Sequence, residues 1–303
     1  MSDVQPVSWR EEYDFASNWF DLSGYRYHYL DVGSGPYCVL AVHGNPTWSF
    51  TFRELARQLP ADPETKRMRV VAVDHLGCGF SDKPQAYPYS LARHRDNLLQ
   101  LIKHLDLRKI ILVAHDWGGA IGLAAAVREL ERFAGLVLLN TAAFPPPYVP
   151  RRIAMCRLPV VGTLALRGLN AFSRAAITMA VASQPLSASA AAGLLAPYGN
   201  WNDRVAVQAF VNDIPTSRRH PTYAVLEELE QGLSHLTDLP TRLVWGMRDW
   251  CFRPECLHRL QGLLPQAITT TLPEVGHYVM EEAPHRVIEA VRGLRDHLDQ
   301  VGE

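Results

Sequence analysis

One aspartate stands where a predicted buried strand meets a predicted helix. Asp116 follows the apolar run Ile110 to Val113, and Gly118 and Gly119 precede the alanine-rich stretch Ala120 to Ala126. Small residues directly after a strand indicate a sharp strand-to-helix turn, which lifts its central side chain above the sheet. A carboxylate held there can displace a leaving group from saturated carbon and become an ester that water then cleaves.

The position of Asp116 also suits a helix N-cap, which is a common role for an aspartate just before a helix. The free N–H groups and the positive dipole end of that helix favour an ionised carboxylate in either role. The flanking glycines, together with two partners elsewhere in the chain, favour the nucleophile.

Two further strand ends supply those partners. The predicted strand Thr241 to Gly246 leads to Asp249, and the predicted strand Thr269 to Leu272 leads to His277. A nucleophile, an acid and a histidine in this chain order are the arrangement expected of an α/β-hydrolase sheet. We expect His277 to be the general base that activates water against the ester, and Asp249 to orient His277 and stabilise its protonated form.

An asparagine follows the predicted central strand Tyr37 to Val42. Because Gly44 and Pro46 bracket Asn45, we expect the backbone N–H groups of this loop to face the site as an oxyanion hole. The preceding His43 is interpreted as a hydrogen-bonding scaffold residue.

Two other features that resemble functional motifs are interpreted as structural. His115 is adjacent to the nucleophile, but at a sharp turn we expect it to point the other way. The glycines between His75 and Pro84 lack the GxGxxG order and a following helix, so we predict no nucleotide site.

Strand and helix patterns alternate along most of the chain, which predicts an α/β fold with a mostly parallel, doubly wound sheet. An antiparallel hairpin is expected from Trp19 to Leu30. Further strands are expected at residues 37–42, 70–74, 110–113, 136–139, 241–246 and 269–272, and helices at 52–59, 91–105 and 285–298. The candidate residues all fall at the carboxyl ends of strands.

The strand pattern is interrupted once. Residues 147–228 form apolar, alanine-rich helical stretches separated by prolines. We interpret them as an all-helical cap domain inserted into a core domain of residues 1–146 and 229–303. Seven apolar residues of the cap are predicted to line a long channel above the nucleophile: Val160, Val161, Leu164, Leu166, Leu169, Ala171 and Phe172.

Composition excludes several function classes. The 303 residues carry a formal net charge of −1, which gives no electrostatic footprint for nucleic acid. The five cysteines lack metal-ligand spacing and indicate free thiols in a reducing compartment. Residues 1–9 have no leader pattern and no segment is apolar enough to span a membrane, so we predict a cytoplasmic protein without metal or cofactor.

Five motifs carry a resemblance that covers nearly the whole chain: His43 to Ser49, Asp74 to Pro84, His115 to Gly119, Asn140 to Phe144 and Gly246 to Trp250. They resemble those of the haloalkane dehalogenases, and within these the third subfamily. That subfamily is itself similar to the β-lactone decarboxylases of bacterial long-chain olefin biosynthesis.

The resemblance implies an α/β-hydrolase fold with an inserted cap and a triad of Asp116, His277 and Asp249. It also implies that Asn45 and Trp117 hold the departing halide, while their backbone N–H groups form the oxyanion hole. Both side chains are neutral donors, which stabilise an anion without trapping it by ion pairing. The implied partners are water, halide and a small apolar substrate, either a haloalkane or a long-chain β-lactone, and self-association into a homo-oligomer is compatible with the family.

Four functions are therefore compared. Haloalkane dehalogenation is the main hypothesis, and decarboxylation of a cis-β-lactone to a cis-alkene and carbon dioxide is the first alternative. An epoxide hydrolase needs cap tyrosines to protonate the epoxide, for which Tyr148, Tyr198 and Tyr223 are candidates, although Asn45 then has no role. A hydrolase-fold receptor without chemistry is the non-enzyme alternative, and the complete set of three triad residues argues against it.

Overall fold

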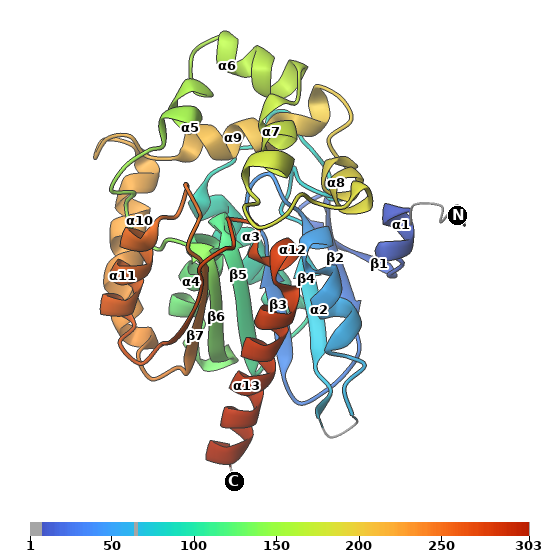
Figure 1. Ribbon diagram of the computed structural model, residues 1–303, viewed down its shortest axis with the longest axis vertical. Coiled ribbons are helices and arrows are strands. Elements are labelled where there is room, and N and C mark those ends of the chain that lie inside the picture. The colour runs from blue at the N-terminus through green and yellow to red at the C-terminus, as the bar shows by residue number, and fades with distance from the viewer. Residues whose placement is uncertain (1–7, 64–65, 303) are drawn as a thin grey trace.

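A computed structural model describes residues 8–63 and 66–302 of the chain, and in this part eight strands form one sheet (Figure 1). The strand order is β1-β2-β4-β3-β5-β6-β7-β8. The strands are β1 Ser17–Leu22, β2 Tyr25–Val32, β3 Cys38–Val42, β4 Arg69–Val73, β5 Ile110–Asp116, β6 Phe133–Thr141, β7 Thr241–Gly246 and β8 Ile268–Leu272. The predicted mostly parallel sheet is confirmed, since only β1–β2 and β2–β4 pair antiparallel.

The predicted edge hairpin is present. Ser23 and Gly24 connect β1 to β2, and their φ angles are 53° and 89°. Two consecutive positive φ values make the turn whose twist matches that of antiparallel strands. Gly24 adopts such a conformation at little cost because it lacks a Cβ.

Helices cover both faces of the sheet and explain why β3 and β5 are buried along their whole length. One face packs against α2 (Arg53–Gln58) and α13 (Pro284–Gly302), and the other packs against α3 (Leu91–His104), α4 (Trp117–Arg128) and α11 (Pro254–Leu263). Figure 1 shows α13 and α2 in front of the strands. Strands buried on both sides read as continuous apolar runs.

The chain reverses its direction across the sheet at β3 and β5. These two strands are neighbours, but β3 is followed along the chain by β4 on one side and β5 by β6 on the other. The loops after such a pair separate and leave a crevice at the carboxyl ends of the strands, where α/β proteins bind ligands. Asn45 follows β3, and Asp116 ends β5.

The segment between β6 and β7 contains helices and no strand among its described residues. They are α5 Arg151–Met155, α6 Val161–Thr163, the π-helical turn η4 Leu164–Gly168, α7 Ala171–Met179, α8 Ala188–Leu195, η5 Asn202–Arg204, α9 Val205–Asp213, α10 Pro221–Gly232 and η6 Leu233–Leu236. Figure 1 shows α5, α6, α7 and α9 above the strands, whereas α10 runs beside α11. Leu226 and Leu229 of α10 belong to the same buried cluster as α3 and α4, so the predicted boundary at residue 228 divides a helix that packs on the core.

The remaining helical elements are short: α1 Trp9–Glu12, η1 Ser49–Phe52, η3 Leu130–Arg132 and α12 Val279–Glu282. Within the described residues, no helix has the length and apolar character needed to cross a bilayer. Residues 1–7, on which part of the expectation about a leader depends, lie outside the described residues. All five cysteines are free thiols.

Candidate active site

Asp116 occupies a tight turn between β5 and α4. Its backbone angles are φ 55° and ψ −127°, a conformation that non-glycine residues rarely adopt. Close packing enforces the turn, since a Cβ on Gly118 would lie 2.0 Å from the carbonyl oxygen of Val42. The Asp116 side chain makes no N-cap hydrogen bond to its helix, so the capping interpretation is wrong.

The carboxylate of Asp116 is instead held from the neighbouring strand. The backbone N–H of Asn45 donates to Oδ1 of Asp116 at 2.7 Å, and the backbone N–H of Trp117 lies near enough to this carboxylate to help lower its pKa. Gly44 allows this approach, because a Cβ there would lie 2.0 Å from Oδ1. The structure thus brings together the two N–H groups that the resemblance implies for an oxyanion hole.

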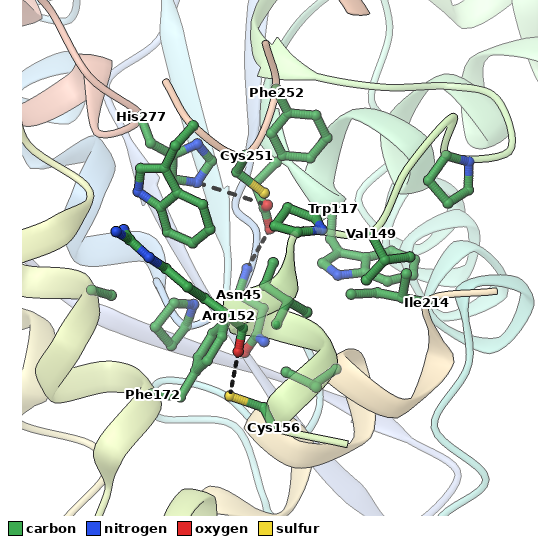
Figure 2. Close-up of a pocket in the computed structure, with 18 of the residues that line it drawn as sticks. Asn45, Trp117, Val149, Arg152, Cys156, Phe172, Ile214, Cys251, Phe252 and His277 are labelled. Atoms are coloured by element: carbon green, nitrogen blue, oxygen red, sulfur yellow. Dashed lines mark hydrogen bonds and ion pairs between the residues drawn. The ribbon is translucent and has the colours of Figure 1, made fainter. Parts of the chain in front are cut away.

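The Asn45 side chain lies at the same place. Its Nδ2 donates to the carbonyl oxygen of Val207 at 3.2 Å, which fixes the amide and leaves its second N–H hydrogen free. Asn45 and Trp117 both line the cavity above Asp116, as does His277 (Figure 2). The side-chain amide of Asn45 and the indole of Trp117 are two neutral N–H donors that line the same cavity as the carboxylate of Asp116.

His277 connects the two aspartates. Its Nδ1 lies 2.8 Å from Oδ2 of Asp249, and its Nε2 lies 3.8 Å from Oδ2 of Asp116. All three side chains are buried. The ring of Phe252 stacks on the imidazole with 5.7 Å between centroids and restricts its tilt. This geometry suits a histidine that is oriented by one carboxylate and faces the other.

The environment shifts the pKa of each group. Burial raises the pKa of Asp116, although His277 and the two N–H groups oppose the increase. Burial alone would raise the pKa of Asp249 and lower that of His277, but their mutual ion pairing reverses both effects, so the pKa of Asp249 is lowered and that of His277 is raised. A charged His277–Asp249 pair is thereby favoured beside Asp116.

Asn140 is a site residue that sequence reasoning did not identify. It is the penultimate residue of β6, with φ 24°; its Nδ2 donates to Oδ2 of Asp249 at 2.9 Å, and its side-chain oxygen accepts from the N–H of Gly246 at 2.7 Å. The N–H of Cys251 completes the support by donating to Oδ1 of Asp249 at 2.6 Å. The only sequence signal was an asparagine at the end of a buried strand, inside a motif that carried the resemblance.

Two histidines near the site are structural, as expected. His43 donates from Nδ1 to the carbonyl oxygen of Gly44 at 2.7 Å and accepts from the N–H of His75 at Nε2 at 3.0 Å. This arrangement fixes the loop that carries Asn45. His115 lies within 2.9 Å of the carbonyl oxygen of His277 through Nε2 and is absent from the cavity lining.

An apolar cavity of about 560 Å³ lies above Asp116. Its lining is largely from the segment between β6 and β7, including Val149, Ile153, Phe172 and Ile214. Figure 2 shows Cys156 across this cavity from His277 and Cys251. The volume is within the range of pockets that enclose drug-sized ligands and is several times that of a two-carbon haloalkane.

The predicted channel residues are correct only in part. Val161, Ala171 and Phe172 line the cavity, but the other four do not. Leu166 packs in a small buried cluster with Ile153 and Val211. Val160, Leu164 and Leu169 face solvent, so an apolar helical residue here does not always point inward.

The cap tyrosines do not form an epoxide-activating pair. Tyr198 is buried, donates to the carbonyl oxygen of Thr47 and is absent from the lining, as is Tyr223. Tyr148 lines the cavity, but its hydroxyl donates to the carbonyl oxygen of Cys251 at 2.8 Å. Of the three candidate tyrosines, only Tyr148 therefore lines the cavity, and its hydroxyl proton is engaged by a backbone carbonyl.

A family model described as the alpha/beta hydrolase fold matches residues 37–284. The chain belongs to the α/β-hydrolase family. This α/β-hydrolase is 35% identical over 284 residues to the cis-3-alkyl-4-alkyloxetan-2-one decarboxylase of Shewanella oneidensis, covering 92% of the chain and 87% of that relative. It is 32% identical over 283 residues to haloalkane dehalogenase 2 of Mycobacterium tuberculosis, covering 92% and 94%.

Solved structures agree with these relatives. The tetrameric haloalkane dehalogenase DpaA from Paraglaciecola agarilytica aligns with a TM-score of 0.75 and 27% identity, over 92% of this α/β-hydrolase and 95% of DpaA. The resemblance to haloalkane dehalogenases and β-lactone decarboxylases is thus confirmed.

Proposed function

We propose that this α/β-hydrolase is a haloalkane dehalogenase, in which Asp116 displaces halide from a saturated carbon and His277 directs hydrolysis of the resulting ester. The observation that carries the proposal is the carboxylate of Asp116 at the turn after β5, beside two neutral N–H donors and an apolar cavity. The helices from α5 to α9 act as the cap that excludes water. Free thiols agree with a cytoplasmic location.

In the first step, one carboxylate oxygen of Asp116 forms a bond to carbon while the carbon–halogen bond breaks and halide leaves with the electron pair. Oδ1 is held by the N–H of Asn45, so Oδ2 is the oxygen free to attack. The indole N–H of Trp117 and the free amide hydrogen of Asn45 stabilise the departing anion. Burial of Asp116 in an apolar cavity raises its reactivity by removing water from the carboxylate.

In the second step, His277 takes a proton from water, and the hydroxide adds to the ester carbonyl carbon of Asp116. The N–H groups of Asn45 and Trp117 stabilise the oxyanion. Collapse releases an alcohol and restores the carboxylate, and Asp249 stabilises the imidazolium that forms meanwhile.

Decarboxylation of a cis-β-lactone is the second candidate, and the size of the cavity favours it. Attack of Asp116 on the ring carbon that bears oxygen would free the lactone's own carboxylate as the leaving group. Loss of carbon dioxide then expels Asp116 and leaves an alkene, without consuming water. Two alkyl chains need a large apolar volume, and each buried methylene contributes about 0.8 kcal/mol.

A parallel assay of purified protein tests both candidates on 1-bromoalkanes and cis-disubstituted β-lactones of increasing chain length. Dehalogenation predicts halide and alcohol in equal amounts, and kcat/KM should rise with chain length as the cavity fills. Alkene and carbon dioxide from the lactones, with a steeper rise, would make decarboxylation the better activity. Absence of halide, alcohol, alkene and carbon dioxide would contradict the proposed chemistry, and Asp116→Ala provides the inactive control.

A further inference from the structure

Charge is distributed unevenly along the chain. Residues 133–202 contain five arginines and no lysine, aspartate or glutamate, whereas the whole chain has a formal net charge of −1. The stretch therefore carries +5, and the remaining residues together carry −6. A segment of one charge sign on an otherwise acidic protein creates a directional field.

The same stretch exposes large apolar side chains. Six of them are between 51% and 71% exposed, and we call them the cap patch: Met155, Leu158, Val160, Val161, Leu164 and Leu169. Single exposed apolar residues are ordinary, but a group from one short segment marks an interaction site. Figure 1 shows α6, within this segment, at the end of the molecule opposite the C-terminus.

The cap patch continues into the cavity. Met155, Leu158 and Val161 line the cavity and are also exposed to solvent, so the cavity opens to the outside within the patch. An apolar substrate entering here would pass from the patch to Asp116 without crossing a polar surface.

The segment that carries the patch also carries basic groups. Arg151, Arg152 and Arg174 are exposed, and in the described part of the chain none of the five arginines forms an ion pair. The guanidinium of Arg167 lies 4.9 Å from the ring centroid of Trp201, a tryptophan that is 40% exposed. Arginines around apolar side chains and a tryptophan are the composition of proteins that insert shallowly into the headgroup region of a bilayer.

We propose that the cap patch docks on an anionic lipid bilayer and admits a membrane-dissolved substrate into the cavity. The substrate part rests on the proposed function, because long-chain bromoalkanes and β-lactones both partition into membranes. The docking part rests only on the charge, the exposed apolar side chains and the opening. Apolar side chains would enter the interface while the arginines contact lipid phosphates.

A second copy of the chain fits the patch less well. Pairing of the patch with itself about a two-fold axis would oppose arginines to arginines, with no acidic residue in residues 133–202 to compensate. Lipid phosphates supply the missing negative charge.

Sedimentation with vesicles tests the docking without any substrate. The full-length protein should bind phosphatidylcholine vesicles that contain phosphatidylglycerol, and bind pure phosphatidylcholine vesicles much more weakly. Each arginine near an anionic membrane surface strengthens binding about fivefold at low salt, so the double variant Arg151→Gln with Arg174→Gln should bind about 25-fold more weakly. Leu164→Gln with Leu169→Gln should also reduce vesicle binding, because both leucines are exposed in the cap patch. Neither leucine lines the cavity, so this pair of changes leaves the cavity wall intact.

Matched controls lie on the core. Arg93→Gln and Ile268→Gln change an exposed arginine and an exposed isoleucine outside the cap, and both should bind vesicles as the parent protein does. Equal binding to neutral and anionic vesicles, or none to either, would overturn the proposal. The proposal would also be overturned if Leu164→Gln with Leu169→Gln changed the oligomeric state, measured by light scattering, but left vesicle binding unchanged.

Activity separates docking from chemistry. On water-soluble 1-bromobutane, the double-arginine and double-leucine variants should keep the parental kcat/KM. On a long bromoalkane embedded in anionic vesicles, both should lose activity in parallel with their loss of vesicle binding. Vesicle binding without turnover of any substrate would refute the proposed function alone. Turnover of 1-bromobutane without vesicle binding would refute the docking alone.

Discussion

The Nε2 atom of His277 faces Oδ2 of Asp116 across 3.8 Å, beyond hydrogen-bonding distance. Burial opposes a charged imidazole, but Asp249 and Asp116 together raise the pKa of His277. Esterification of Asp116 would remove one of these two negative charges. The pKa of His277 should therefore fall when the ester forms, which is the moment at which a neutral base is needed.

His277→Ala should accumulate the ester. Alkylation uses only Asp116 and the two N–H donors, so it should proceed, while hydrolysis lacks its base. After incubation with a 1-bromoalkane, mass spectrometry should find one added alkyl group on the peptide that carries Asp116. Free alcohol without an adduct would contradict the role of His277.

The two half-reactions should differ in pH dependence. Alkylation needs ionised Asp116, whose pKa burial raises, so its rate should decline as pH falls through a value above the ordinary 3.8. Hydrolysis needs neutral His277, so its rate should also decline as pH falls, but at a higher pH than the decline in alkylation. Rapid-quench measurement of ester formation and ester loss checks this, and an alkylation rate unchanged down to pH 3.8 would refute the raised pKa.

Water labelled with ¹⁸O should distinguish the two candidate reactions. Hydrolysis adds water oxygen to the Asp116 carboxyl, so several turnovers of a bromoalkane should label the peptide that carries Asp116. Decarboxylation of a β-lactone consumes no water and should leave the peptide unlabelled. Label in the alcohol instead of the peptide would indicate direct attack of water on the substrate, without an ester.

Halide should bind the resting enzyme between Asn45 and Trp117. Bromide or iodide should quench tryptophan fluorescence saturably, and Asn45→Ala and Trp117→Phe should each weaken the effect. Trp19→Phe, at an exposed position in β1, is the control and should keep it. Linear quenching in all four proteins would mean that no halide site exists.

Asn140→Ala should slow hydrolysis of the ester about 10- to 100-fold, because a hydrogen bond to a charged group contributes about 1.5–3 kcal/mol. Alanine is also strained at φ 24°, so Asn140→Gly serves as the comparison that loses the same bonds without the strain. Equal hydrolysis rates in both variants with different unfolding midpoints would separate positioning of Asp249 from stability. Parental hydrolysis rates would contradict the positioning role.

Strand ends were predictable because a buried parallel strand reads as an apolar run, and Asp116, Asp249 and His277 each follow one. The bond between Asn140 and Asp249 was not predictable, because it depends on β6 and β7 being neighbours and on an unusual φ. The sequence pattern places Leu164 and Leu169 in the cavity wall, whereas both face solvent, because an apolar residue in a helical segment can face a core, a cavity or solvent. The sequence pattern alone does not distinguish these surroundings.

Asp116, Asp249 and His277 all lie outside the helices from α5 to α9, whereas most of the cavity wall comes from that segment. Under the proposed function, reactivity and substrate range are consequently encoded by separate stretches of the chain. Exchange of residues 147–213 with the corresponding segment of a related enzyme should transfer chain-length preference and leave the chemistry in place. Directed evolution of this protein for new substrates could therefore confine its mutations to one contiguous portion of the gene.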